Sequence, residues 1–180
     1  MSTGKRKGES RDAQRERLWP KSADKVWRGH HEKGYFCGPR NLPLILHLIR
    51  EKGVCGSFDA ARVYVELLAR DMGEGFVEIM DEDEHAYCAG YVGSRAVRTW
   101  RERVLALEKA GFIRVFPKAN RKIGYVVIMH PRLVVLEMRR QRKVTDVWWR
   151  MYQDRQERIG APTDDDPAVE KHLKVVGKRS

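Results

Sequence analysis

A regular apolar stripe between residues 94 and 110 constrains the fold more than any other feature of the sequence. The stripe consists of Val97, Trp100, Val104 and Leu107, whose spacings of three, four and three residues place them on one face of an α-helix. Gly111 follows where a left-handed residue commonly ends a helix, and Ser94 stands where a side chain can cap the start. The pattern predicts a helix over 94–110 with Trp100 in the core.

Shorter runs on both sides predict the remaining elements. Two β-rich runs, 112–116 and 123–129, follow the helix and are joined by a loop over 117–122, with Phe116 and Tyr125 expected as core contacts of the hairpin. The upstream elements are expected to be a helix over 42–52 capped by Asn41, a helix over 57–72 capped by Ser57, a strand over 76–80 and a helix over 81–91. Downstream, Pro131 opens a long helix that runs to about Arg158. The expected class is therefore mainly α with a small antiparallel sheet (α+β).

Composition divides the chain into four parts. Residues 1–18 are basic and lack an apolar period, which predicts a disordered arm. Residues 19–130 form the expected domain, with an N-terminal extension and a core over 41–130. Residues 131–159 are a helical extension, and residues 160–180, which contain Pro162 and Pro167, are an expected disordered tail.

The net charge of +11 on 180 residues is unevenly distributed. Residues 41–92 hold four basic and ten acidic side chains, whereas residues 93–130 hold nine basic and two acidic ones. Such a reversal indicates one surface suited to a polyanion and another that repels it.

Other features restrict the location and the chemistry. Apolar runs stay well below the roughly 20 residues of a membrane span, and the polar start of the chain lacks a signal sequence. The cysteines Cys37, Cys55 and Cys88 are odd in number and not closely spaced, which argues against a disulfide framework or a cysteine zinc site. We therefore expect a cytoplasmic protein without membrane partners.

The run from Gly90 to Ile128 resembles the second half of a winged helix-turn-helix DNA-binding domain. Such domains follow the order helix, strand, helix, turn, helix, strand, wing, strand, and the elements predicted from residue 57 to residue 129 follow the same order. The most specific piece is Leu107–Ile113, in which a helix ends at a glycine and an apolar strand begins. The resemblance covers about 75 residues and implies a winged-helix core that binds double-stranded DNA.

Two groups of residues are then candidates for DNA contact. The N-terminal turns of a helix in the major groove come nearest the base edges, and arginine can bind both acceptors of guanine. The amides at the helix start suit a phosphate, and the wing lies beside the backbone or the minor groove. The candidates are Ser94, Arg95, Arg98, Thr99, Arg101 and Glu102 on the helix, and Lys118, Asn120, Arg121 and Lys122 on the wing. The arginines could equally solvate an exposed helix face.

The acidic run Asp81–Glu84 lies beside His85 and close to Cys88, which admits a metal or acid–base site. Consecutive residues on a helix point in different directions, however, and no second ligand cluster stands at a suitable spacing. We interpret the run as an acidic helix start, which favours the helix dipole but would repel DNA phosphates. No catalytic residues, cofactor or metal are predicted, and His47 is expected in the core of its apolar helix.

The C-terminal helix carries an apolar face that either folds back over the core or pairs with a second copy of the chain. The dimer face would consist of Val144, Val147, Trp148, Met151 and Tyr152. The basic residues Arg139–Lys143 interrupt the stripe, so two segments that bend near residue 140 are favoured over an unbroken coiled coil.

The sequence thus predicts a non-enzymatic, sequence-specific double-stranded DNA-binding protein, most simply a bacterial transcriptional repressor or autoregulator. Plasmid or phage replication initiation and partition use the same chemistry and stay open as alternatives. An RNA-binding or protein-assembly module built on a winged-helix scaffold is an alternative of another class.

Overall fold

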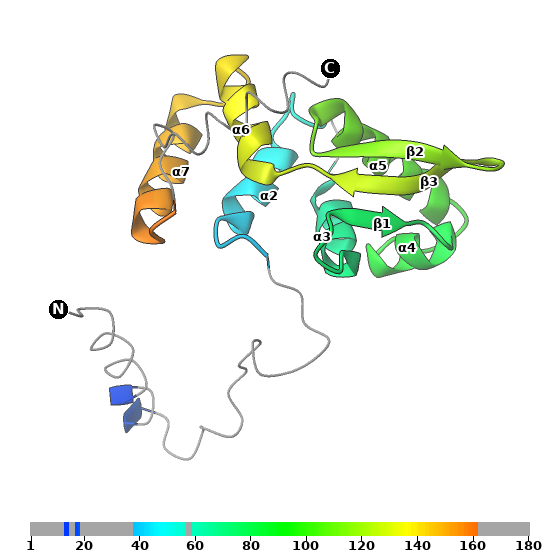
Figure 1. Ribbon diagram of the computed structural model, residues 1–180, viewed down its shortest axis with the longest axis horizontal. Coiled ribbons are helices and arrows are strands. Elements are labelled where there is room, and N and C mark those ends of the chain that lie inside the picture. Colours follow the sequence, from blue (N-terminus) through cyan, green and yellow to red (C-terminus); the bar gives the residue numbers. More distant parts are fainter. Residues whose placement is uncertain (1–12, 15–16, 19–37, 57–58, 162–180) are drawn as a thin grey trace. The chain divides into compact units, whose positions relative to one another are not determined.

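The computed structural model describes residues 13–14, 17–18, 38–56 and 59–161 (Figure 1). The chain divides into two compact units, residues 1–35 and 36–180. The described residues of the first unit, Ala13, Gln14, Arg17 and Leu18, have helical backbone. The rest of the expected arm, most of residues 19–40, the expected cap Ser57 and nearly all of the expected tail lie outside the described residues.

Helices dominate the second unit, and a three-stranded antiparallel sheet accompanies them, so the predicted α+β class is confirmed. The elements are α2 (Leu42–Arg50), α3 (Ala61–Arg70), β1 (Phe76–Glu78), α4 (Glu82–Cys88), α5 (Ala96–Ala110), β2 (Ile113–Lys118), β3 (Arg121–Ile128), α6 (Pro131–Arg140) and α7 (Asp146–Arg158). From α3 to β3 they follow one another in the predicted order, and β3 lies between β1 and β2 in the sheet.

The core forms where α5, α3 and the inner face of the sheet meet. Trp100, Val104 and Leu107 of the predicted stripe are fully buried. Tyr64 of α3 packs edge-on against Phe112, with 5.4 Å between ring centroids. Gly111 ends α5 with φ of 87°, and the N–H of Phe112 donates to the carbonyl of Leu107 at 3.0 Å. The apolar period and the glycine stop therefore act as predicted.

Helix starts differ from the predictions in their side-chain partners. α5 begins at Ala96 with Arg95 at the cap position, and no side chain caps it, so the prediction that Ser94 caps it is wrong. Asn41 precedes α2, but its side chain donates instead to Oε1 of Gln156 at 3.2 Å. Asp81 does cap α4, where its carboxylate accepts the N–H of Asp83 at 2.9 Å, as an acidic helix start predicts.

The β2–β3 connection is shorter than the expected loop over 117–122. Lys118 pairs with Arg121, and only Ala119 and Asn120 form the turn. Gly124 of β3 lies so close to β2 that a Cβ there would overlap the backbone of Lys118. The two strands therefore stay close together near the end of the hairpin, and the tip projects beyond α4 and α5 (Figure 1).

The outward face of this hairpin also differs from the prediction. Phe116 pairs with Tyr125 across the two strands, but its side chain is 68% exposed. Strand residues alternate between the two faces of a sheet, and Val115 and Val126 occupy the inner one. Phe116 and Tyr125, which lies opposite it on the same face, are therefore not core contacts, so this prediction is wrong for both.

The long C-terminal helix expected from Pro131 is broken into α6 and α7. Arg142 adopts φ of 55°, and the N–H of Lys143 donates back to the carbonyl of Met138 at 2.9 Å, which ends α6. Thr145 then caps α7 by accepting the N–H of Trp148 at 3.3 Å. The break lies a few residues beyond the bend expected near residue 140.

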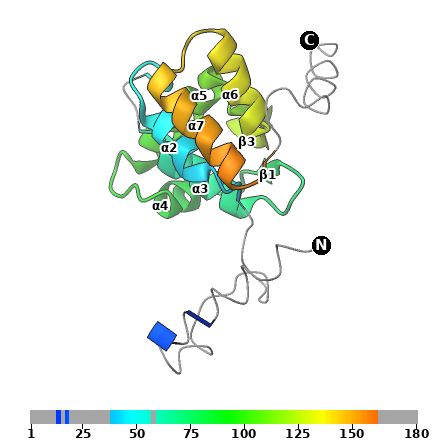
Figure 2. The same ribbon diagram turned by 90° about the vertical axis from the view of Figure 1, so that its left-hand side faces the viewer.

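α6 and α7 do not form a free extension, because α7 packs along α2 (Figure 2). The indole Nε1 of Trp148 donates to the carbonyl of Leu44 at 3.1 Å, and Trp148 stacks on Tyr152 with 5.0 Å between centroids. Val144, Trp148 and Tyr152 are buried in this contact.

Candidate functional site

The start of α5 is exposed. Ser94 and Arg95 lie on the surface, and the side chain of Arg98 is 78% exposed. Nε of Arg98 donates to Oε1 of Glu102 at 3.1 Å, an ion pair within one helix turn. Thr99 is half-buried. The first turn thus exposes the Arg98 side chain, and no side chain caps its amide groups, although the N–H of Ala96 donates to the carbonyl of Gly93 at 3.0 Å.

One turn further, Arg101 is engaged by the acidic start of α4. Its Nε lies 3.0 Å from both carboxylate oxygens of Glu82, and its Nη2 also donates to Oε2. The hydrogen bond to Glu82 raises the pKa of Arg101. The Glu82 carboxylate therefore screens one of the predicted DNA-contacting arginines and is itself neutralised.

The basic residues of the hairpin are also largely paired. Nζ of Lys118 donates to the carboxylate of Glu78 on β1, which raises the pKa of Lys118. Nη1 of Arg121 donates to the carbonyl of Ile79 at 3.1 Å and to that of Met80. Asn120 and Lys122 are exposed near the tip.

Together these contacts describe an interface of mixed sign. The predicted residues on α5 and on the hairpin flank the segment from Glu78 to Glu82 and hold it by ion pairs and carbonyl contacts. Within the described residues, three charged candidates form no ion pair: Arg95, Lys122 and Arg121, of which Arg121 is bonded to backbone carbonyls. The geometry offers anion contacts at the two ends and carboxylates between them.

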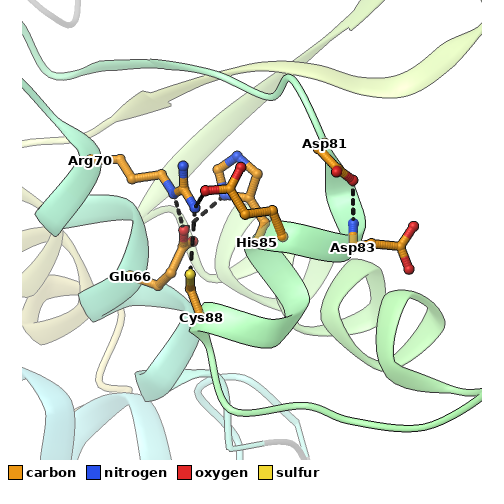
Figure 3. Close-up of polar contacts among 7 residues, drawn as sticks. Glu66, Arg70, Asp81, Asp83, His85 and Cys88 are labelled. Atoms are coloured by element: carbon orange, nitrogen blue, oxygen red, sulfur yellow. Dashed lines mark hydrogen bonds and ion pairs between the residues drawn. The ribbon is translucent and has the colours of Figure 1, made fainter.

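A buried charged network lies behind this surface (Figure 3). His85 of α4 is 1% exposed, and its Nδ1 is hydrogen-bonded to Oε1 of Glu66 on α3 at 2.9 Å. Arg70 donates to the same carboxylate and reaches Glu84 at 3.0 Å with Nη2. Burial lowers the pKa of Arg70, but the bonds to Glu66 and Glu84 outweigh it and raise the pKa overall.

This network orients the helices. The His85 ring contacts the Trp100 indole with 5.4 Å between centroids, so α3, α4 and α5 meet at one histidine. Nη2 of Arg70 also lies 3.7 Å from Sγ of Cys88, at the wall of a groove of about 750 Å³ between α3 and α4. Among the described residues, no three His, Cys, Asp or Glu side chains are placed to hold a metal ion.

The sequence pattern did not predict that His85 is buried, and it placed His47 in the core instead. The side chain of His47 is 67% exposed and lies 3.5 Å from Glu51, so the prediction of a buried His47 is wrong. Glu66 provides the signal that was available, because it stands between Val63 and Leu67 on the buried side of α3. A carboxylate in an apolar stripe requires a buried partner.

The expected dimer face is mostly inside the molecule. Val144, Trp148 and Tyr152 pack on the chain's own core and cannot contact a second copy. Val147 and Met151 are 63% and 55% exposed. Of the two alternatives for the C-terminal segment, folding back over the core is the one observed.

Every helix in the described part of the chain is too short or too polar to cross a lipid bilayer. Comparison of the chain with models of protein families, with curated protein sequences and with solved structures gives no match in any of the three.

Proposed function

We propose that this chain is a winged-helix protein that binds double-stranded DNA in a sequence-specific manner and serves as a bacterial transcriptional repressor or autoregulator. The observation that carries the proposal is the start of α5, where Ser94, Arg95 and Arg98 are exposed, together with a basic hairpin that projects beyond α4 and α5 (Figure 1). An exposed helix start followed by such a hairpin suits the major groove and an adjacent backbone.

Each group has a distinct role in the proposal. Arg95 and Arg98 read base edges, and the uncapped amides at the start of α5 take a phosphate. Lys122 and Asn120 reach the backbone or the minor groove from the hairpin tip. Base contacts of this kind discriminate by about 1–3 kcal/mol each.

The arginines and lysines that form ion pairs can contact DNA only if a phosphate replaces their carboxylate partner. Exposed ion pairs such as Arg98–Glu102 are worth about 0–1 kcal/mol, so a phosphate displaces the carboxylate at little cost. Arg101 is held on both oxygens of Glu82 and exchanges less readily. DNA contact is therefore concentrated at the helix start and the hairpin tip, away from the carboxylates of residues 81–84.

Selection of bound fragments from a random duplex pool tests the proposal directly. We expect a consensus sequence whose affinity exceeds that of random duplex and falls steeply with salt. Recovery of no consensus, with equal affinity for duplex DNA and for RNA, would contradict sequence-specific regulation and favour a scaffold or assembly role.

Two variants then assign the roles on the selected site. Arg98→Ala should relax specificity at one base position, at a cost of about 1–3 kcal/mol. Lys122→Ala should weaken all duplexes alike and reduce the salt slope by about 0.9. Arg158→Ala, at an exposed position on α7, is the matched control and should change neither quantity. Identical behaviour of Arg98→Ala and Lys122→Ala would refute this division of roles.

A further inference from the structure

The outer face of the sheet carries large exposed apolar side chains from all three strands. Phe76 of β1 is 44% exposed, Phe116 of β2 is 68% exposed and Val127 of β3 is 44% exposed. The register places Phe76 opposite Val127, and Phe116 opposite Tyr125. The outer face therefore carries aromatic and aliphatic side chains on neighbouring strands, and these side chains are largely exposed among the described residues.

The rings of this surface are arranged for stacking. Phe76 and Tyr125 lie nearly parallel, with 5.6 Å between centroids and 25° between planes. Phe116 stands on the neighbouring strand, and adjacent strands lie about 4.8 Å apart. Nζ of Lys118 lies 5.4 Å from the centroid of the Tyr125 ring. The sheet thus presents a stacked pair of rings with a cation over one of them, and the separate ring of Phe116 on β2.

The charges beside these rings favour an anionic ligand. Arg114 is exposed on the same face, opposite Val127, and forms no ion pair with any described residue. Lys118 is offset by Glu78, whereas Lys122 extends the positive charge towards the hairpin tip. A ligand with both negative charge and flat rings would satisfy the whole face.

We propose that the outer face of the β1–β3–β2 sheet binds single-stranded nucleic acid, with unpaired bases stacked on Phe116 and on the Phe76–Tyr125 pair, and phosphates on Arg114 and Lys118. The site goes beyond the proposed duplex contact, because it uses a different surface from the start of α5. Bases in a duplex are stacked on each other and present only their edges, so they cannot use exposed rings in this way.

A second copy of the chain fits the face less well. A two-fold contact places the same patch on both partners, so each copy would add an Arg114 that forms no ion pair with any described residue. Like charges at a buried contact are unfavourable. Single-stranded nucleic acid avoids that repulsion, because its phosphates are negative, and its bases supply rings that can stack.

Fluorescence anisotropy with the full chain tests the proposal, with labelled thymidine and uridine dodecanucleotides as probes and a duplex of the same length for comparison. Phe116→Ala should weaken binding of the single strands about 5- to 150-fold, the range that corresponds to loss of one stacked base. Phe116→Trp should retain binding. Arg114→Gln should reduce the salt slope by about 0.7.

Matched variants separate stacking from other causes. Met151→Ala removes a side chain of similar exposure from α7 and should leave binding unchanged within twofold. Phe116→Leu keeps an apolar side chain without a π-face and should lose affinity as Phe116→Ala does. Thermal unfolding of each variant checks that the fold persists, which the exposure of Phe116 favours.

Several outcomes overturn the proposal. Binding of Phe116→Leu at the level of the unchanged chain would show a general apolar contact, and unchanged binding by Phe116→Ala would exclude the face altogether. A dimer in sedimentation that Phe116→Lys dissociates, without any single-strand binding, would assign the face to a second copy. Loss of duplex affinity in Arg98→Ala with single-strand affinity intact tests α5 separately, so the two proposals can fail independently.

Discussion

The contacts that join α3 to α4 and α5 differ in kind from those that join α2 to α7. The first set centres on charged groups, with Glu66 bound to both His85 and Arg70. The second set is apolar and neutral, with the indole of Trp148 against Leu44 and the side chain of Asn41 bonded to Gln156. Both sets are buried, yet they differ in what they specify.

Buried charged contacts fix the relative orientation of the helices that they join, whereas burial of apolar side chains contributes most of the free energy of unfolding. A carboxylate with two partners tolerates little displacement, but its net contribution is small because both charges lose hydration. Burial of apolar surface contributes about 25 cal/mol per Å² with little dependence on angle. We therefore expect the Glu66–His85 contact to set the orientation of α5, and the Trp148 contact to hold the C-terminal pair in place.

The largest effect should come from the apolar region. Trp148→Ala removes a side chain that is 3% exposed and leaves the carbonyl of Leu44 without its donor, so unfolding in urea should show a loss of about 3–5 kcal/mol. Val147→Ala, at the neighbouring 63% exposed position, should cost less than about 0.5 kcal/mol. Similar losses in both variants would mean that α7 does not depend on this contact.

Changing Glu66 to Gln should sharpen the contrast. The amide keeps the shape but loses the charge that His85 and Arg70 share, and we expect a loss of about 2 kcal/mol. Duplex affinity should fall as well, because α5 loses its orientation, whereas in folded Trp148→Ala it should not. Glu157→Gln, at an exposed position on α7, serves as the control. A larger loss of stability than in Trp148→Ala would reverse the comparison.

Cys55 lies in the segment that connects α2 to α3, and its thiol provides a pH test. Burial of the Cys55 thiol, together with Asp59, raises its pKa from 9.0 to about 12. Because the pKa of Cys55 is higher in the folded than in the unfolded state, the protonated thiol favours folding fully below about pH 9. This contribution is lost as the pH rises towards 12. The unfolding free energy should fall by up to about 1.4 kcal/mol per pH unit between these values relative to Cys55→Ala.

Alkylation of the thiols at pH 8 checks the same environment. In a Cys37→Ser background, the exposed Cys88 should react quickly and the buried Cys55 only on unfolding. Equal reactivity of the two thiols in the native protein would place Cys55 at the surface.

Among the variants that break a described contact, Glu82→Gln should change stability least. The Arg101 side chain is 53% exposed in this pair, so the unfolding free energy should change by less than about 1 kcal/mol. Duplex affinity should nevertheless increase, because Arg101 is released and a carboxylate is removed beside the proposed interface. Glu137→Gln on α6 should leave that affinity unchanged. Weaker duplex binding by Glu82→Gln would mean that Glu82 positions Arg101 for contact.

The parts of the fold that could be predicted from the sequence are those determined by local pattern. The stripe of α5 and the stop at Gly111 follow from helix periodicity and from backbone freedom, both of which are properties of short segments. The acidic start of α4 follows from capping and from the helix dipole. The wing was predicted as an element, but its two-residue turn depends on the pairing of Lys118 with Arg121.

The site was less predictable because its contacts join distant residues. Nothing local indicates that Arg101 meets Glu82 or that Lys118 meets Glu78, and these pairs change which cations remain available. The break at Arg142 lacks the usual glycine, and the local signal for a second helix is Thr145, a residue type that commonly caps a helix start. Helix formers on both sides of the break suggested continuity, but burial of Val144 and Trp148 against the core required two helices.

Gly124 has a consequence for the molecule's reach. At this position β2 and β3 lie so close together that only a hydrogen atom fits. A methyl group on residue 124 would push the strands apart and move the hairpin end, which includes Lys122. The direction in which the hairpin projects thus depends on the absence of a side chain at residue 124.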